Sequence, residues 1–216
     1  MSVEVDWDPA VLRLYERALW DRATLRACDG AGADLDFDVR RWLRPADRAD
    51  LTMLARCTGP TLDIGCGPGR LVAALARRGV PALGVDVAAA AIALTRSAGG
   101  LALRRSVFDR VPGAGRWQAA LLADGNVGIG GDVGGLLARI RELLAPGAVV
   151  VVEVEADGIS RRTRVQVTGA AGRETAAFAW ARVGWSALVA EAVAIGFVAV
   201  EQWSCDGRHF ASLQRI

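Results

Sequence analysis

Short apolar runs alternate with longer Ala- and Leu-rich stretches through the middle of the chain, between residues 60 and 144. Each run has the length and composition of a buried strand, and each stretch places apolar residues at helical spacing. This alternation is typical of parallel βαβ units, so we expect an α/β fold. Strands are predicted at 61–64, 82–85, 101–104, 118–123 and 148–156, and helices at 70–78, 88–97 and 133–144.

The pattern changes after the fifth predicted strand. Two runs predict an antiparallel insertion, and the last runs of the chain predict a terminal hairpin. At the other end, residues 9–22 predict an amphipathic helix and residues 25–37 a short hairpin around Asp29-Gly30. The later elements are strands at 163–168 and 175–180 joined by a turn at 169–173, a helix at 185–195, and strands at 197–203 and 209–215.

Length and charge narrow the possible classes of protein. A chain of 216 residues suits one compact domain with a small appendage. The formal net charge is +2, and the basic and acidic residues are mixed along the chain, so no basic stripe predicts a nucleic-acid partner. All 26 basic residues are arginine, a bias typical of GC-rich genomes, and we expect a bacterial source.

The cysteines and the N-terminus indicate the compartment. The four cysteines are far apart, with no CxxC pair and no neighbouring histidine, so neither a metal site nor a disulfide framework is predicted. The first residues are acidic where a signal peptide would be basic, and no apolar run has the length of a membrane span. We therefore expect a cytoplasmic protein with no membrane partner.

A glycine-rich turn, TLDIGCGPGR at residues 61–70, joins the first predicted strand to the first predicted helix. Glycines there let the backbone approach a ligand, and the helix start offers free N–H groups. A dinucleotide fingerprint, GxGxxG, would need glycine at Arg70, but glycine stands one residue earlier, at Gly69. A nicotinamide-dependent oxidoreductase is therefore the weaker alternative.

The same turn has the form DxGxGxG, beginning at Asp63, and a second acid, Asp86, ends the next strand in GVDVAAAAI. With these marks the sequence resembles the class I S-adenosylmethionine-dependent methyltransferases. The resemblance implies that Asp63, Gly65 and Gly67 shape the pocket for the methionine part of the cofactor, and that Asp86 accepts hydrogen bonds from the ribose hydroxyls. Taken singly, either acid could instead be a capping residue.

The next two loops match the family less closely. After the third strand an acid often meets the adenine, but here Ser106 stands at that position and Asp109 follows late. After the fourth strand, LLADGNVGIGGD lacks the N/D-P-P-Y/F sequence of nucleic-acid and glutamine methyltransferases. The cofactor-binding residues that the resemblance implies are Asp63, Gly65, Cys66, Gly67, Gly69, Asp86, Val87, Ser106, Val107, Phe108 and Asp124.

Methyl transfer from a sulfonium mainly needs alignment, and a base is needed only where the acceptor must lose a proton. Asp124, at the end of the fourth strand, and His209, the only histidine, are the candidate bases, and either could be structural. The arginines of the insertion could bind an anionic acceptor or could form a solvated face of the hairpin. The candidate acceptor-binding residues are Trp7, Tyr15, Trp20, Asn126 and Trp180, and core packing explains those of the first helix equally well.

The resemblance implies a seven-stranded, mostly parallel sheet of order 3-2-1-4-5-7-6 with helices on both faces and a terminal antiparallel hairpin. We expect residues 1–44 to form an N-terminal lid and residues 45–216 the cofactor-binding domain, with an insertion at about 157–183. The expected function is methyl transfer from S-adenosyl-L-methionine to a small molecule, with S-adenosyl-L-homocysteine as the other product. The acceptor atom (oxygen, nitrogen or carbon) and the oligomeric state stay open, as do two alternatives, another reaction of the same cofactor and a non-catalytic relative.

Overall fold

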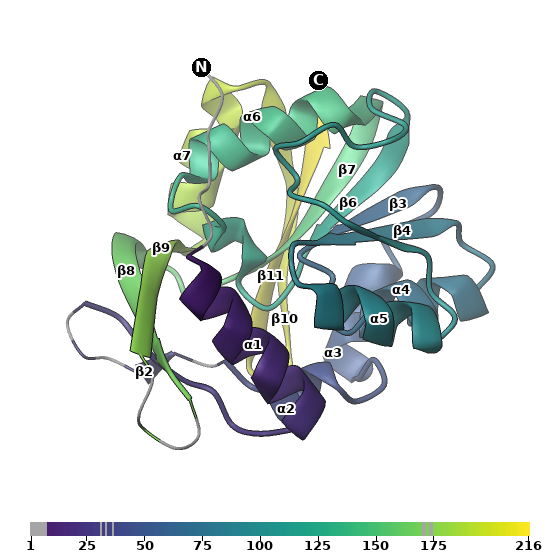
Figure 1. Cartoon of the computed structure of the whole chain (residues 1–216). Coiled ribbons are helices and arrows are strands. Elements are labelled where there is room, and N and C mark those ends of the chain that lie inside the picture. The colour runs from purple at the N-terminus through teal and green to yellow at the C-terminus, as the bar shows by residue number, and fades with distance from the viewer. Residues whose placement is uncertain (1–7, 31, 33, 36, 170–171, 173–174) are drawn as a thin grey trace.

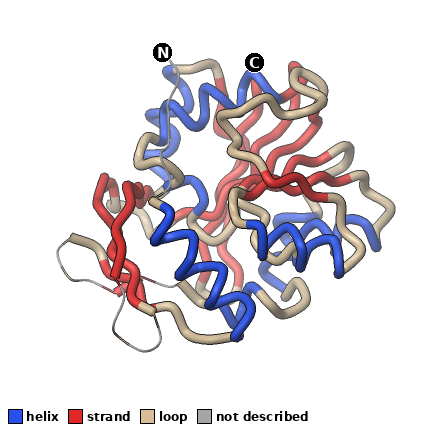
Figure 2. The backbone as a smooth tube through the Cα atoms, in the orientation of Figure 1, coloured by secondary structure: helices blue, strands red, loops and turns tan. Residues whose placement is uncertain are grey.

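A seven-stranded sheet forms the centre of the molecule, with helices on both of its faces, in the computed structural model of the chain (Figures 1 and 2). The structure describes all residues except 1–7, 31, 33, 36, 170–171 and 173–174. Trp7 and part of the predicted turn at 169–173 therefore lie outside the described residues. Within the described part of the chain, no helix is both long and apolar enough to cross a membrane.

The strand order of this sheet confirms the predicted topology. The order is β10-β11-β7-β6-β3-β4-β5, which is 3-2-1-4-5-7-6 when the seven strands are counted along the chain. Neighbours from β5 to β7 are parallel, and β11 is antiparallel to both β7 and β10. The strands are β3 (Thr61–Ile64), β4 (Ala82–Asp86), β5 (Ala102–Arg104), β6 (Trp117–Leu122), β7 (Leu144–Val154), β10 (Phe197–Cys205) and β11 (Arg208–Arg215).

Alternation along the central strands sends successive side chains to opposite helix layers. On β6, Ala120 and Leu122 belong to the same apolar cluster as Leu136 and Ile140 of α6, whereas Leu121 packs in the cluster that holds Leu75 of α4. Both faces of the sheet are therefore buried, as the continuous apolar runs predict. The layer helices are α3 (Arg48–Leu54), α4 (Arg70–Arg77), α5 (Ala89–Ser97), α6 (Val133–Leu143) and α7 (Trp185–Ala194).

The boundary between α6 and β7 differs from the prediction. The helix ends at Leu143, and the strand begins at Leu144, ahead of the predicted start at 148. Leu144 pairs with Trp117 and Val149 with Ala119, so four residues of β7 lie opposite one residue of β6. A proline cannot donate to a sheet ladder but is tolerated in such a bulge, which is how Pro146 fits inside the strand.

A second, four-stranded antiparallel sheet combines the N-terminal segment with the insertion, and its order is β2-β1-β8-β9 (Figure 1). The two hairpins were predicted separately, and the structure joins them through β1 and β8, where Ala27 pairs with Val167. Helix α1 (Pro9–Asp21) lies beside this sheet and contacts β8, β9 and α5. The strands are β1 (Arg26–Cys28), β2 (Asp34–Leu35), β8 (Ser160–Thr168) and β9 (Thr175–Val183).

Two helices were not predicted. The four-residue α2 (Val39–Trp42) is too short to give a periodic signal. Helix α3 begins with a capping box, in which the Asp47 carboxylate accepts from the Asp50 N–H and the Asp50 carboxylate from the Asp47 N–H. Two acids at this spacing are a start signal that the sequence offers. Both helices contribute residues to the site.

Candidate functional site

A cavity lies at the carboxyl ends of β3, β4, β5 and β6, between the central sheet and the layer formed by α1 and the second sheet. It encloses about 980 Å³ of space free of atoms, its open mouth included. Parallel α/β sheets bind ligands at this edge because the loops that follow the strands converge there. One half is lined by the glycine loop and the ends of β4 and β5, and the other half by aromatic side chains.

The glycine loop adopts a backbone conformation that side chains would disturb. Gly65, Gly67 and Gly69 have φ values of 68°, 53° and 85°. The N–H of Gly65 donates to the Val85 carbonyl at 2.9 Å, which joins the loop to the neighbouring strand. A Cβ atom on Gly67 would have one neighbour within 4 Å, the Tyr15 hydroxyl at 3.3 Å. The loop therefore presents bare backbone to the cavity.

Asp86 ties this loop to the start of α5. Its Oδ2 accepts from the Gly67 N–H at 3.0 Å and its Oδ1 from the Ala88 N–H at 2.8 Å. Burial raises the pKa of Asp86 to about 6, although these backbone hydrogen bonds oppose the shift. The carboxylate lines the cavity beside the loop, where it can accept further hydrogen bonds from a ligand.

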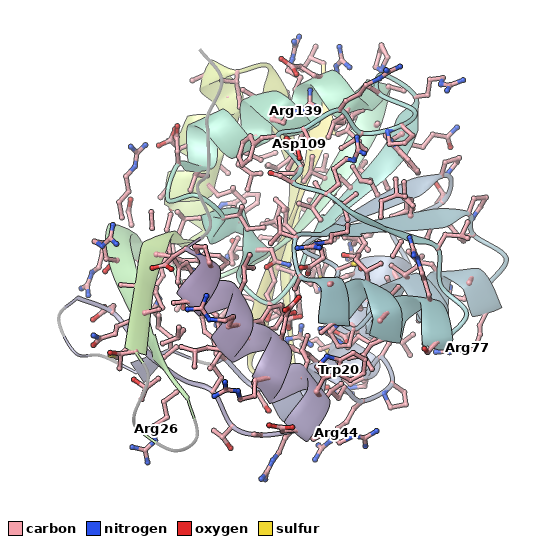
Figure 3. All side chains as sticks on the ribbon, viewed as in Figure 1. Trp20, Arg26, Arg44, Arg77, Asp109 and Arg139 are labelled. Carbon is pink, nitrogen blue, oxygen red and sulfur yellow. The ribbon has the colours of Figure 1, made fainter. Side chains whose placement is uncertain are left out.

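The structure brings most of the predicted site residues to this cavity but not all of them. Gly69 and Phe108 do not line it, and Trp20 is 59% exposed at the end of α1 (Figure 3). Asn126 lines the cavity, but its amide donates to the carbonyls of Ile64 and Gly65, both at 2.9 Å. The predicted residues that line the cavity are Tyr15, Gly65, Cys66, Gly67, Asp86, Val87, Ser106, Val107, Asp124, Asn126 and Trp180.

Asp63 lies beneath the cavity and does not line it. The side chain is 1% exposed, and Oδ2 has no hydrogen-bond partner among the described residues. Burial raises the pKa of Asp63 to about 7, against the opposing charge of Arg70. The carboxyl group is therefore protonated over much of the acidic range, where an exposed aspartate is ionised.

We expect Asp63→Asn to reduce the dependence of stability on pH. Between about pH 4 and about pH 7 the native state keeps the Asp63 proton while the unfolded chain has lost it, so this group lowers the free energy of unfolding as the pH rises. The amide has the same shape and does not titrate. Urea unfolding at pH 4.5, 6 and 7.5 should show wild type losing stability relative to the variant.

The exposed Glu142 of α6 supplies the control for this prediction. Glu142→Gln should give a curve parallel to that of wild type over the same pH range. Equal slopes for wild type and Asp63→Asn, or a wild type that gains stability relative to the variant, would contradict the assigned protonation state of Asp63.

Arg70, the first residue of α4, is the centre of a buried ion network. Its guanidinium group binds both oxygens of Asp50 at 2.9 Å, and it binds Asp124 at 2.5 and 3.0 Å. Arg208 joins the network through Asp50 at 2.9 Å and binds both oxygens of Glu153 at 2.7 and 2.8 Å. These contacts connect four parts of the fold along one side of the cavity: α3, α4, the end of β6 and the terminal hairpin.

Within this network Asp124 has little freedom to act as a base. Arg41 binds its Oδ1 at 3.0 Å, so both carboxylate oxygens are in ion pairs with guanidinium groups. Both oxygens therefore already accept hydrogen bonds from arginine side chains. Its φ is 54°, and its N–H donates to Glu153 Oε2 at 2.6 Å. The geometry supports a structural role for Asp124.

His209, the other candidate base, does not line the glycine-loop cavity. It stands on β11 opposite Val154 and lines a second cavity of about 840 Å³. Phe37, Asp124 and Trp180 line both cavities and form the partition between them. His209 is therefore separated from the glycine loop by this partition.

Helix α1 is fastened over the cavity by Glu16. Glu16 Oε1 accepts from the backbone N–H groups of Ala89 and Ala90 at 2.6 and 3.3 Å, at the start of α5. Ala88, the N-cap residue of α5, has no polar side chain that could accept hydrogen bonds from these N–H groups. The capping carboxylate therefore comes from another helix. The contact holds Tyr15 over the glycine loop, where burial and then Asp86 raise the pKa of its hydroxyl.

Five rings form one side of the cavity, and we name them the aromatic wall: Tyr15, Phe37, Trp42, Phe178 and Trp180. Phe178 and Trp180 are on β9, and the other three come from the N-terminal segment. Of these, only Tyr15 and Trp180 were predicted as site residues. The sequence gives no local signal for the rest, because their roles depend on the pairing of β1 with β8.

The arginines of the insertion are largely engaged with acids of the chain. Arg161 pairs with Asp29 at 2.8 Å, and Arg182 pairs with Glu155 at 2.6 Å. Arg161 is more than half exposed, and Arg182 faces the second cavity. These ion pairs favour the interpretation that the arginines form a solvated face. They do not favour the alternative that the arginines bind an anionic acceptor at the glycine-loop cavity.

Comparisons with known proteins agree with this geometry. Residues 62–116 match the sequence model of a family described as a methyltransferase domain. The whole chain superposes on an S-adenosylmethionine-dependent methyltransferase from Bacteroides fragilis, solved with S-adenosyl-L-homocysteine, with a TM-score of 0.79, 19% identity and 100% of both chains covered. No curated protein matches the sequence.

Two further solved structures share the fold. The 1,6-didemethyltoxoflavin-N1-methyltransferase of Burkholderia thailandensis matches 95% of this chain and 87% of its own, at TM-score 0.62 and 19% identity. CalS10, an amino pentose methyltransferase of Micromonospora echinaspora, matches 79% of this chain and 89% of its own, at TM-score 0.57 and 25% identity. Residues 62–116, which include the glycine loop and the acid at the end of β4, therefore match a methyltransferase-domain family, and the whole chain has the fold of solved class I S-adenosylmethionine-dependent methyltransferases.

Proposed function

We propose that the cavity binds S-adenosylmethionine along the glycine loop and transfers its methyl group to a small molecule held against the aromatic wall. The observation that carries this proposal is a single cavity with two chemically different halves. One half has bare backbone and the Asp86 carboxylate, and the other is apolar and lies under α1 and β9. A two-substrate transfer needs such neighbouring sites.

The cofactor half fits a nucleoside with a charged amino-acid tail. A Cβ at Gly67 would occupy space at the cavity surface, so glycine keeps this space open for the ligand. We propose that Asp86 accepts from the ribose hydroxyls and that Ser106 and Val107, beyond β5, lie along the adenine. Asp63, beneath the loop, would act on the ligand through the loop geometry instead of by contact.

When bound, the cofactor supplies an electrophilic methyl group on a sulfonium. The chain's own residues then have to orient the acceptor and exclude water, which is the main requirement of an in-line displacement. Helix α1, fastened by Glu16, covers the cavity, and we propose that residues 1–44 act as the lid of the site. The ion network of Arg70 fixes the side of the cavity that Arg70 and Asp124 line.

The enclosed shape supports a small acceptor. Two structural neighbours, a 1,6-didemethyltoxoflavin-N1-methyltransferase and an amino pentose methyltransferase, have small-molecule acceptors. A macromolecular substrate would need an open surface at the aromatic wall, but α1 packs against α5 and β9 there.

Calorimetric titration with S-adenosylmethionine, S-adenosylhomocysteine and NADH tests the proposal. We expect the first two to bind and NADH not to bind. Asp86→Ala should weaken S-adenosylmethionine binding by about 1–3 kcal/mol, the cost of losing a charged hydrogen-bond partner. Glu142→Ala, an exposed acid on α6, should leave the affinity unchanged.

Far-UV circular dichroism would show that the Asp86→Ala protein is folded. If the folded variant binds as tightly as wild type, Asp86 is not the ribose partner. If wild type binds NADH, or binds none of the three ligands, the proposed function is wrong.

A further inference from the structure

The aromatic wall gives the acceptor half of the cavity its chemical character. Phe178 and Trp180 are only 8% and 7% exposed, and Phe37 and Trp42 are partly buried against the same apolar cluster. Val167 and Ile129 fill the space around the rings. A ligand on this side of the cavity therefore contacts ring carbons and aliphatic carbons, which favour an apolar surface.

The rings of the wall pack directly on one another. Ring centroids are 5.5 Å apart for Phe178 and Trp180, 5.7 Å for Phe37 and Trp42, and 6.0 Å for Tyr15 and Trp42. These are distances of direct edge-to-face contact, with no room for a group between two rings. A cage for an ammonium ion would need its rings spread around the ion. The wall instead offers closely packed ring faces and edges, and a flat ring can lie against an exposed face.

The charged groups that line the cavity on the side of Trp180 are already compensated. Asp124 adjoins Trp180 in the lining of both cavities, and it is paired with Arg41 and Arg70. Arg70 is in turn paired with Asp50. An ammonium or a carboxylate on the acceptor would lose its hydration here without gaining an unpaired partner of opposite charge in this network. A neutral acceptor has no such cost.

One polar atom of the wall lacks a partner. The indole Nε1–H of Trp42 is buried and donates to no acceptor among the described residues. Two other indole N–H groups have hydrogen-bond acceptors: Trp203 donates to Thr52 Oγ1 at 2.8 Å and Trp117 to the Pro112 carbonyl at 2.9 Å. Buried indole N–H groups ordinarily have a partner, and Trp42 lines the cavity. A ligand atom that accepts a hydrogen bond would complete it.

We infer that the methyl acceptor is a neutral, flat ring compound that lies against the aromatic wall and accepts a hydrogen bond from Trp42 Nε1. This inference rests on the proposed function, because it assigns the apolar half of the cavity to the acceptor. The substrate class is then aromatic or heteroaromatic, and Trp42 selects within that class.

The test uses quinoline and naphthalene, which have the same shape but differ in one ring nitrogen that can accept a hydrogen bond. Each is titrated calorimetrically into the protein with and without S-adenosylhomocysteine. Methyl β-D-glucopyranoside and tetramethylammonium are the sugar and cation probes. We expect quinoline to bind about threefold to tenfold more tightly than naphthalene, as for one hydrogen bond, and we expect no saturable binding of the other two.

Trp42→Phe keeps a ring in the wall and removes the N–H. It should weaken quinoline binding by the same factor of about three to ten and leave naphthalene binding nearly unchanged. Trp203→Phe is the matched control, because Trp203 stacks on Phe210 in the terminal hairpin and does not line the cavity. It should change neither affinity. Phe178→Leu, which removes a ring, should weaken both ligands.

The outcomes separate the two proposals. If S-adenosylhomocysteine binds but quinoline does not, or if the sugar or the cation binds more tightly than quinoline, the ring-acceptor inference is overturned and the methyltransferase proposal stands. An unchanged preference for quinoline in Trp42→Phe overturns the role of its N–H. Quinoline binding in the expected pattern without any binding of S-adenosylhomocysteine supports the wall as a ring site and overturns the proposed cofactor.

Discussion

Arg70→Met is expected to lower the free energy of unfolding by about 3 kcal/mol, the lower end of the range for breaking a buried ion pair. Asp50 is 1% exposed and would lose two hydrogen bonds from the guanidinium group, and Asp124 would lose two more. Arg208 and Arg41 still contact these two acids in the variant, which is why the expected loss is not larger.

The pKa of Asp50 gives a second readout of the same change. Burial alone would raise it, but the hydrogen bonds and charge of Arg70, helped by Arg208, hold it at about 2. Removing Arg70 should raise this pKa toward its value in the unfolded chain, so Asp50 should contribute less to stability at neutral pH, and the variant should lose less stability than wild type as the pH falls from about 4 toward 2. Urea unfolding at pH 7 and pH 3 measures both effects, because the difference between the two proteins should be smaller at pH 3.

Arg77→Met on the same helix is the control, because Arg77 is exposed on the outside of α4 (Figure 3). It should change the free energy of unfolding by about 0.5 kcal/mol or less. If Arg70→Met costs no more than Arg77→Met, the ion network does not stabilise the fold, and its part in holding the cavity wall would have to be abandoned.

Gly69→Ala is expected to cost about 2–5 kcal/mol, the sum of a left-handed backbone penalty and an overpacking penalty. The φ of Gly69 is 85°, and a Cβ there would lie 2.5 Å from Thr95 Oγ1 and Cγ2. Thr95 is fully buried on α5 and donates to the Gly67 carbonyl at 2.9 Å. Displacing Thr95 therefore also releases the loop, so S-adenosylmethionine binding should fall together with stability.

Gly79→Ala separates the two penalties. Gly79 also has a positive φ, 73°, but a Cβ there would meet nothing within 4 Å. It should show the backbone penalty alone, about 1–2 kcal/mol, and unchanged cofactor affinity. Thermal unfolding and calorimetric titration of the two variants side by side give the comparison. Equal losses of stability would mean that Thr95 moves aside without cost, and unchanged cofactor affinity in Gly69→Ala would mean that Thr95 does not hold the loop.

The central sheet could be predicted because its information is local. A buried parallel strand is a continuous apolar run, its helix has apolar residues at a period near 3.6, and a glycine turn marks the passage between them. Residues 61–64 therefore appear as β3 with the predicted bounds, and Asp86 ends β4 as expected. The strand order came from the family resemblance and is confirmed.

The roles of individual polar residues were harder to predict from the sequence. Arg70 appeared in the sequence only as the residue that breaks a dinucleotide fingerprint, and the structure makes it the centre of an ion network that joins α3 to the end of β6. Asp124 was a candidate base, but Arg41 of α2 and Arg70 of α4 are both paired with it in the structure. Trp20, on the same helix as Tyr15, turns outward. Each outcome depends on contacts between segments far apart in the chain.

By itself, the sequence determined the βαβ core, the glycine loop and the acid at the end of β4, because propensity, period and turn chemistry act over a few residues. Only the tertiary structure decided the acceptor side. Cys28 pairs with Gln166, and this long-range pairing brings Phe37 against Phe178 and Trp180. Strand pairing across such a distance is set by the burial of whole faces, which no local pattern records.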